Sequence, residues 1–162
     1  MLYWVFDLDY TLYSLPKSIE FSYDLLKKDE RVNTLLRSYP LRKEIFTNGT
    51  LQHAYNVLQK MKMYNIFHRI EARDTLDGLK PNPAVFLNFI KKGNIQPNDV
   101  VVFFEDTLEN LKVAKEFFNW KTVYIFSDLH SNYKKPYFVD FVFPNINTAL
   151  EYFHFKFNMK EM

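Results

Sequence analysis

The stretch Val5-Phe6-Asp7-Leu8-Asp9-Tyr10-Thr11-Leu12-Tyr13 places two acidic side chains directly after an apolar run from Met1 to Phe6. This run has the length and composition of a strand buried in a parallel sheet. Side chains two positions apart on an extended segment point the same way, so Asp7 and Asp9 are expected to converge on one small volume. Open α/β sheets bind their ligands at this carboxyl end of the strands.

Two carboxylates held this close together favour a cation between them. Mg²⁺ is a hard cation that prefers oxygen ligands, so it would stabilise the pair formed by Asp7 and Asp9 and attract a phosphate. The same pattern taken alone is also typical of a surface turn in which Asp and Thr cap the following loop. The choice between a metal site and a turn therefore depends on the rest of the chain.

Composition indicates one globular domain over residues 1–162, with 48% hydrophobic and 19% aromatic residues. The 21 basic and 19 acidic residues give a formal net charge of +2, so nothing requires nucleic acid or an anionic membrane as a partner. The absence of Cys excludes disulfides, thiolate zinc sites and a Cys nucleophile, and it fits a reducing compartment. No apolar run reaches membrane-spanning length, and the first residues lack the basic region of a signal peptide. A soluble, cytoplasmic protein is therefore expected.

Strands and helices are predicted to alternate along the chain. Besides the first run, strands are expected over 43–47, 68–72, 100–104, 122–126 and, at an edge, 139–143. Helices are expected over 51–61, 84–92 and 107–118. A closing helix would present one apolar face made of Ile146, Ala149, Leu150, Phe153 and Phe157. This alternation predicts an α/β fold with a doubly wound, Rossmann-like parallel sheet and right-handed crossovers.

The segment from Ser14 to Pro40 differs from the rest and has the character of an insertion. Its apolar residues suggest one or two short helices that are separated near residues 27–30, and Pro40 would end the second. We interpret residues 14–40 as a reduced helical cap inserted within the single domain.

Polar side chains follow three of the predicted strands, at the point where each strand ends. In chain order they are Asp7, Asp9, Thr47, Asn48, Glu105 and Asp106. Lys80 precedes the helix that would cover the same edge. Each piece alone has a simple structural explanation, namely a helix cap, a solvated lysine or an acidic group favoured by a helix dipole. Together, and in this order, they favour one shared site.

Four ordered motifs resemble those of the haloacid dehalogenase superfamily of aspartyl phosphohydrolases. They are Asp7-Leu8-Asp9-Tyr10-Thr11-Leu12, Thr47-Asn48, Lys80-Pro81-Asn82-Pro83 and Glu105-Asp106-Thr107-Leu108-Glu109-Asn110. A finer resemblance, to the pyrimidine 5′-nucleotidase branch, rests on Phe46-Thr47-Asn48-Gly49, His53-Ala54, Val57-Leu58, Phe103-Phe104-Glu105-Asp106 and Asn110. The resemblance covers residues 1–13 and about 43–126.

The resemblance implies phosphoryl transfer in two steps. Asp7 would attack phosphorus and form an aspartyl-phosphate, and Asp9 would protonate the leaving alcohol and then deprotonate the attacking water. The carboxylates of Asp7 and Asp106, the main-chain carbonyl of Asp9 and waters would hold Mg²⁺. Glu105 would bind this ion directly or support the residues that do.

The remaining motif residues are expected to bind the phosphate and brace the site. Thr47 and Asn48, with the N–H groups at the following helix start, would bind phosphoryl oxygens. Lys80 would contact the phosphate, offset its charge and orient the nucleophile. Thr11 is expected to fix the turn after the first strand, and Asn110 to brace the acidic loop.

The acid at position 9 selects a subclass. The resemblance implies that dehalogenases lack an acid at the position of Asp9 and that the related ion-pumping ATPases carry Thr there. The expected function is therefore a Mg²⁺-dependent phosphomonoesterase, similar to a 5′-nucleotidase acting on nucleoside monophosphates.

The short insertion means that the sequence does not determine which phosphorylated substrate the site accepts. The interval from Tyr13 to Arg42 is thirty residues long, shorter than the helical cap of the nucleotidases that the chain resembles. The site could accept a larger or different phosphorylated substrate, or a second subunit could cover it. A non-catalytic phosphate-binding or assembly module is the remaining alternative.

Several aromatic side chains and one histidine lie in or near the motifs. Tyr10, Tyr13, Phe21 and Tyr23 could stack on a base, although packing is the preferred interpretation in so aromatic a chain. His53 is interpreted as a helix-packing or surface residue.

Overall fold

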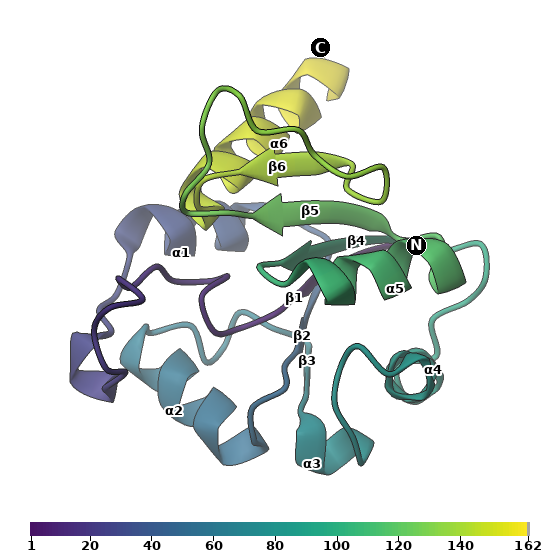
Figure 1. Cartoon of the computed structure of the whole chain (residues 1–162), viewed down its shortest axis with the longest axis horizontal. Helices are drawn as coiled ribbons and strands as arrows, with labels where there is room; N and C mark the ends of the chain where they lie inside the picture. The colour runs from purple at the N-terminus through teal and green to yellow at the C-terminus, as the bar shows by residue number, and fades with distance from the viewer. Residues whose placement is uncertain (162) are drawn as a thin grey trace.

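The computed structural model describes residues 1–161, and side chains as far as residue 156. Within this range one sheet of six parallel strands runs through the molecule, with helices on both of its faces (Figure 1). The strands are β1 (Leu2–Phe6), β2 (Arg42–Phe46), β3 (Arg69–Glu71), β4 (Val100–Glu105), β5 (Lys121–Ile125) and β6 (Phe141–Phe143). Their order in the sheet is β3-β2-β1-β4-β5-β6. The predicted doubly wound α/β fold is confirmed.

Each predicted strand and helix is present, and one short helix was not expected. The helices are α1 (Glu30–Ser38), α2 (Leu51–Lys60), α3 (Arg73–Leu76), α4 (Pro83–Lys92), α5 (Leu108–Phe118) and α6 (Ile146–Glu161), with the 3-10 turn η1 (Tyr23–Leu25). Thr50 caps α2 and Asn82 caps α4, because each side-chain oxygen accepts a hydrogen bond from a main-chain N–H of the first turn. The unexpected helix, α3, has four residues, too few to produce a helical periodicity in the sequence.

Two apolar cores lie on opposite faces of the sheet. On one face, α1, α2 and α6 pack against side chains of the central strands, among them Phe6, Ile45 and Phe104. On the other face, α4 and α5 cover Val5, Phe46 and their neighbours. Figure 1 shows these two helix layers on either side of the strands. Side chains of a strand alternate between the faces, so β1 contributes to both cores.

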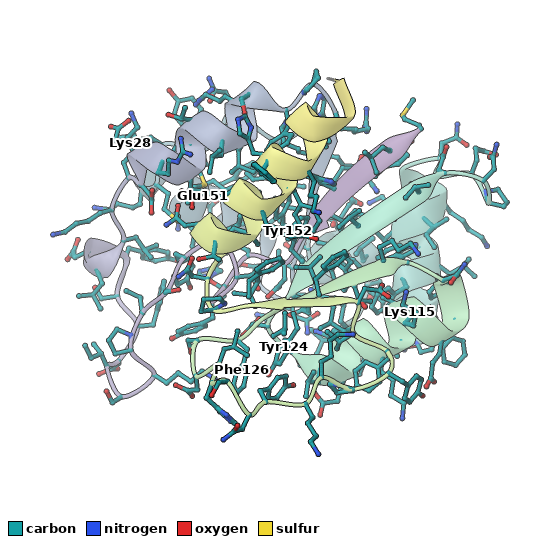
Figure 2. All side chains as sticks on the ribbon, turned by 90° about the horizontal axis from the view of Figure 1, so that it is seen from above. Lys28, Lys115, Tyr124, Phe126, Glu151 and Tyr152 are labelled. Carbon is teal, nitrogen blue, oxygen red and sulfur yellow. The ribbon has the colours of Figure 1, made fainter. Side chains whose placement is uncertain are left out.

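The segment 14–40 contains η1 and α1, and these two elements are placed differently. Val32, Leu35 and Leu36 of α1 are buried in the first core. On the outer surface, Arg31 of α1 forms an ion pair of 3.1 Å with Glu151 of α6, and Figure 2 shows Glu151 on α6. The helix α1 is therefore part of a packed layer, and the stretch that precedes it forms the loop next to the site.

The closing helix α6 uses the apolar face that the sequence predicts. Ile146, Ala149 and Leu150 are buried, and the ring of Phe153 contacts Trp4 and Phe104. The side chain of Phe157, predicted on the same face, lies outside the described residues. Within residues 1–161, none of the helices is both long and apolar enough to cross a membrane.

Candidate active site

The carboxyl ends of β1, β2 and β4 meet at one cleft of about 170 Å³. The main-chain N–H of Asp7 donates to the carbonyl of Phe104 at 2.9 Å, which continues the pairing of β1 with β4 past the last strand residue. The first acidic motif is thereby fixed beside the last one. The residues that line the cleft are Asp7, Asp9, Thr47, Asn48, Gly49, Glu105, Asp106, Thr107 and Asn110.

Lys80 lies beneath the cleft and is almost completely buried. Its ammonium donates to Asp7 Oδ1 at 3.1 Å, to Glu105 Oε2 at 2.9 Å and to the carbonyl of Phe46 at 2.6 Å. Burial lowers the pKa of Lys80, but the charges of Asp7 and Glu105 outweigh this effect and raise it above its ordinary value. An ammonium has three hydrogens to donate, and these three protein acceptors use them all. This arrangement favours charge balance and orientation of Asp7 over direct contact with a phosphate.

Glu105 has both carboxylate oxygens engaged by the protein. Oε1 accepts from the main-chain N–H groups of Asp106 and Thr107, at 3.1 and 3.2 Å. Oε2 accepts from Lys80 and from Asn110 Nδ2, the latter at 3.2 Å. An ionised carboxylate offers about four acceptor positions, so these four donors use them all. The geometry favours Glu105 as a brace of the acidic loop over a direct metal ligand, and it gives Asn110 the bracing contact expected of it.

Thr11 connects the two acids that face the cleft. Its hydroxyl lies 3.2 Å from Asp7 Oδ2 and 3.2 Å from Asp106 Oδ1. The turn that brings it there passes through Tyr10, whose φ of 61° lies in the left-handed region. Main-chain bonds from Thr11 and Leu12 to the carbonyl of Leu8 close this turn. Thr11 therefore fixes both the turn and the spacing of the two carboxylates.

The loop after β2 forms the opposite wall of the cleft. Asn48 exchanges two hydrogen bonds with the main chain of Lys80: Nδ2 donates to its carbonyl at 3.0 Å, and Oδ1 accepts from its N–H at 2.8 Å. Thr47 Oγ1 accepts from the N–H of Gly49 at 3.0 Å and can still donate its own hydrogen into the cleft. An added Cβ at position 49 would lie 2.9 Å from Cδ2 of His53, so a larger residue there would force the His53 ring to shift.

The charges at the cleft are unbalanced, since four carboxylates line it and one lysine lies beneath it. Burial tends to raise the pKa of Asp7, but the Lys80 charge and hydrogen bonds outweigh it and hold that pKa below its ordinary value. Burial raises the pKa of Asp106 to about 7, with further contributions from its hydrogen bond to Asp7 and from the Asp7 charge. Burial and the same charge raise the pKa of Glu105 well above its ordinary value. A divalent cation would compensate the excess negative charge.

The donor atoms fit Mg²⁺. Oxygen atoms of Asp7, Glu105 and Asp106 lie within 4.8 Å of one another. These are hard carboxylate ligands, and the chain has no thiol to offer a softer metal. Because Glu105 already has four donors, Asp7 and Asp106 are the carboxylates with capacity for an ion.

Asp9 has partners that were not predicted from the sequence. His53 Nε2 lies 2.8 Å from Asp9 Oδ1 and 3.0 Å from Oδ2, and Tyr13 donates to Oδ1 at 2.6 Å. Tyr23 in turn lies 2.7 Å from the other ring nitrogen of His53. The interpretation of His53 as a packing or surface residue is therefore corrected. Its position in the first turn of α2, directly after the Thr47-Asn48 motif, is the signal that could have placed it at this edge.

A family model described as haloacid dehalogenase-like hydrolase matches residues 30–125 of the chain. Similar solved structures include the L-2-haloacid dehalogenase of Xanthobacter autotrophicus with chloropropionic acid covalently bound, at 15% identity and a TM-score of 0.62. A HAD phosphatase of Thermococcus onnurineus has 20% identity and a TM-score of 0.56. YfnB of Bacillus subtilis, bound to magnesium, has 15% identity and a TM-score of 0.62.

These three structures share the fold of the chain but are longer proteins. The matches cover 82%, 74% and 80% of this chain in the order given above. They cover 63%, 54% and 56% of the other proteins. The chain thus spans between about half and two thirds of their length.

Proposed function

Because the chain belongs to the haloacid dehalogenase-like hydrolase family, we propose that it is a Mg²⁺-dependent phosphomonoesterase acting through an aspartyl-phosphate. The observation that carries this proposal is Asp9, a second carboxylate in the cleft whose hydrogen-bond partners differ from those of Asp7. A halide leaves carbon as a stable anion, whereas an alkoxide leaving phosphorus needs a proton. A separately held acid beside the nucleophile therefore favours phosphate ester hydrolysis over dehalogenation.

In the first step, an oxygen of Asp7 attacks phosphorus while the bond from phosphorus to the ester oxygen breaks. Lys80 and Thr11 hold the Asp7 carboxylate from two sides, so it is oriented before substrate binds. Asp9 gives its proton to the leaving oxygen. Mg²⁺, when held by Asp7, Asp106 and the Asp9 carbonyl, would supply the charge compensation that lets an anionic nucleophile approach an anionic phosphate.

In the second step, Asp9 accepts a proton from water as the water oxygen bonds to phosphorus. The bond between phosphorus and Asp7 breaks, which releases inorganic phosphate, frees the Asp7 carboxylate and leaves Asp9 protonated for the next cycle. The Thr47 hydroxyl and the main-chain N–H groups of the loop that follows β2 are the proposed donors to the phosphoryl oxygens. Asn48 contributes by holding the Lys80 segment in place.

The proposed substrate class is a nucleoside monophosphate, as in the pyrimidine 5′-nucleotidase branch that the motifs resemble. Tyr10, Tyr13, Phe21 and Tyr23 follow one another in ring contact, with centroid separations of 5.6, 6.3 and 5.3 Å. Tyr13 also bonds Asp9, so this aromatic row starts at the side where a leaving group would extend. A nucleobase can stack on such rings.

Hydrolysis assays separate this proposal from its alternatives. The wild type and Asp7→Asn would be incubated with Mg²⁺ and p-nitrophenyl phosphate, then with nucleoside monophosphates, sugar phosphates and phosphopeptides. Release by the wild type and loss of at least about 10³-fold in the variant are expected, since the variant lacks the nucleophile. Asp77→Asn, at an exposed position away from the cleft, is the matched control.

Three outcomes would change the proposed function or its substrate class. Equal background release from both proteins would favour a non-catalytic phosphate-binding module, whereas chloride release from 2-chloropropionate would favour a dehalogenase. Turnover of phosphopeptides or sugar phosphates without any preference for nucleotides would retain the phosphatase but replace the substrate class.

A further inference from the structure

Asp9 is held by Tyr13, in the turn after β1, and by His53 of α2, and these partners differ from those of Asp7. Its Oδ1 has two short contacts, to the Tyr13 hydroxyl at 2.6 Å and to His53 Nε2 at 2.8 Å. Its Oδ2 has the longer contact to the same nitrogen, at 3.0 Å. The side chains of His53 and Asp9 are 23% and 30% exposed, so this contact lies at the wall of the cleft and not in the core.

The hydrogen on the His53 ring can be assigned from its contacts. The Tyr23 hydroxyl lies 2.7 Å from Nδ1 and can donate to it. Nε2 faces both oxygens of a carboxylate, where a nitrogen lone pair would be repelled and an N–H is favoured. The Asp9 carboxylate therefore favours the tautomer in which Nε2 carries the hydrogen and donates it to Asp9, and the Tyr23 hydroxyl can complement this tautomer by donating to Nδ1.

We infer that His53 is a positioning residue for proton transfer by Asp9 and that Tyr23 supports the tautomer that makes this possible. The inference rests on the proposed phosphatase function. Oδ1 accepts from Tyr13 and has the shorter contact with His53, so Oδ2, whose one contact is the longer one to His53, is the oxygen that carries the exchanged proton. That proton passes from Oδ2 to the ester oxygen as the phosphorus–oxygen bond breaks. Water later returns a proton to Oδ2 as it displaces Asp7 from phosphorus.

Tyr23 lies in η1, within the short insertion, so the pair Tyr23–His53 connects that loop to the acid. The rings of Tyr23 and Phe21 are 5.3 Å apart, and Phe21 also contacts the His53 ring at 5.6 Å. Phe21 and Tyr23, which are proposed to face the leaving group, thus contact His53, the residue that orients the proton donor Asp9. The loop would therefore influence turnover and not substrate affinity alone.

Leaving-group dependence distinguishes positioning of Asp9 from a structural role. An alkoxide such as the 5′ oxygen of a nucleoside is strongly basic and needs the proton, whereas p-nitrophenolate is weakly basic and leaves without it. For His53→Phe we expect kcat/KM to fall on the order of 10²-fold with a nucleoside monophosphate but only a few-fold with p-nitrophenyl phosphate. This ratio is measured as kcat/KM because it reports the transfer to Asp7 and not the later hydrolysis.

Two further variants sharpen the comparison. Tyr23→Phe removes the donor to Nδ1, so we expect a smaller loss, about tenfold, with the same dependence on the leaving group. His53→Gln retains a side-chain N–H donor and should recover part of the nucleotide activity. Tyr55→Phe, on the exposed side of the same helix at 49% exposure, is the matched control and should behave as the wild type.

Nitrogen NMR of the imidazole provides a test that does not depend on activity. The wild type should show a hydrogen on His53 Nε2, and Tyr23→Phe should increase the other tautomer. Equal losses with both substrates, or a wild-type ring protonated only on Nδ1, would overturn the inference while leaving the phosphatase in place. A wild type that hydrolyses neither substrate would instead overturn the proposed function.

Discussion

Lys80 and Glu105 form an ion pair of 2.9 Å beneath the cleft, with side chains that are 0% and 1% exposed. The same ammonium lies 3.1 Å from Asp7 Oδ1. A charge this deeply buried is stable only with its partners, and here the partners include the proposed nucleophile. The stability of the fold and the orientation of Asp7 consequently depend on one residue.

Replacing this lysine should therefore damage both properties. Lys80→Met leaves two buried carboxylates without their countercharge, and we expect the free energy of unfolding to fall by about 3–5 kcal/mol. Denaturant titration of the metal-free protein measures the loss, with Lys112→Met at an exposed position as the control. A loss as small as that of the control would show that Lys80 is not needed as a countercharge.

The two acids of the last motif should differ in their effect on metal binding. Asp106→Asn removes a proposed direct ligand and should abolish Mg²⁺ binding at millimolar concentration. Glu105→Gln changes a residue that the protein already engages on both oxygens, and a loss of about 10–100-fold in affinity is expected. Titration calorimetry compares the two variants. Indistinguishable affinities for them would contradict the bracing role of Glu105.

Mg²⁺ binding should strengthen as the pH rises through neutrality. The pKa of Asp106 is raised to about 7 without metal, so below pH 7 this carboxyl is mostly protonated and a proton must leave before the ion binds. The apparent affinity should therefore increase by up to about tenfold per pH unit between pH 5 and 7, then level off. Calorimetry in buffers of different ionisation enthalpy would count the protons released, and a flat profile would contradict the prediction.

The raised pKa of Asp106 also affects the stability of the metal-free protein. A carboxyl whose pKa is higher in the folded state than in the unfolded chain binds its proton more tightly when folded. Its contribution to stability is thus present below the unfolded pKa and declines as the pH rises to about 7. Denaturation of the metal-free wild type and of Asp106→Asn at pH 4.5 and 7.5 would isolate this contribution. A decline of the same size in the variant would assign it to other groups.

Asn48 should affect catalysis through the Lys80 segment. Asn48→Ala removes both hydrogen bonds to the main chain of Lys80, and we expect a loss of about 1–3 kcal/mol in unfolding free energy. A fall in kcat without a matching rise in KM should accompany it, because the ammonium that orients Asp7 would be less well placed. Asn132→Ala, at an exposed position, is the control. If only KM rose, direct binding of substrate by the Asn48 side chain would be the better explanation.

The sheet and the gathering of acids at its edge were predictable from the sequence. Buried parallel strands produce continuous apolar runs, and a parallel sheet brings their carboxyl ends to one edge. Local residue patterns were therefore sufficient to place Asp7, Thr47 and Glu105 together. The helix α3 was not predicted because its four residues show no periodicity. The N–H of Ala72, just before the helix, donates to the Thr75 hydroxyl and helps to hold it.

The contact of His53 with Asp9 and the choice between two roles for Glu105 were not predictable. His53 and Asp9 are 44 positions apart, and no local pattern relates them. The engagement of Glu105 depends on where the side chains of Lys80 and Asn110 end, which only the folded chain determines. Sequence motifs therefore identified the acids and suggested roles for Asp7 and Asp9, and the contacts added the partners of Asp9 and of Glu105 on which the proposed roles rest.

The burial pattern of the insertion loop suggests how the substrate specificity of the protein can change. Tyr13 and Leu26 are buried at 8% and 6% exposure, and each residue from 14 to 25 between them is exposed or half-buried. We expect that replacing residues 14–25, between the buried Tyr13 and Leu26, would preserve the denaturation midpoint and alter the preferred substrate. A chimera that failed to fold would refute this. New specificities could then arise by substitution within residues 14–25, with the packed layers unchanged.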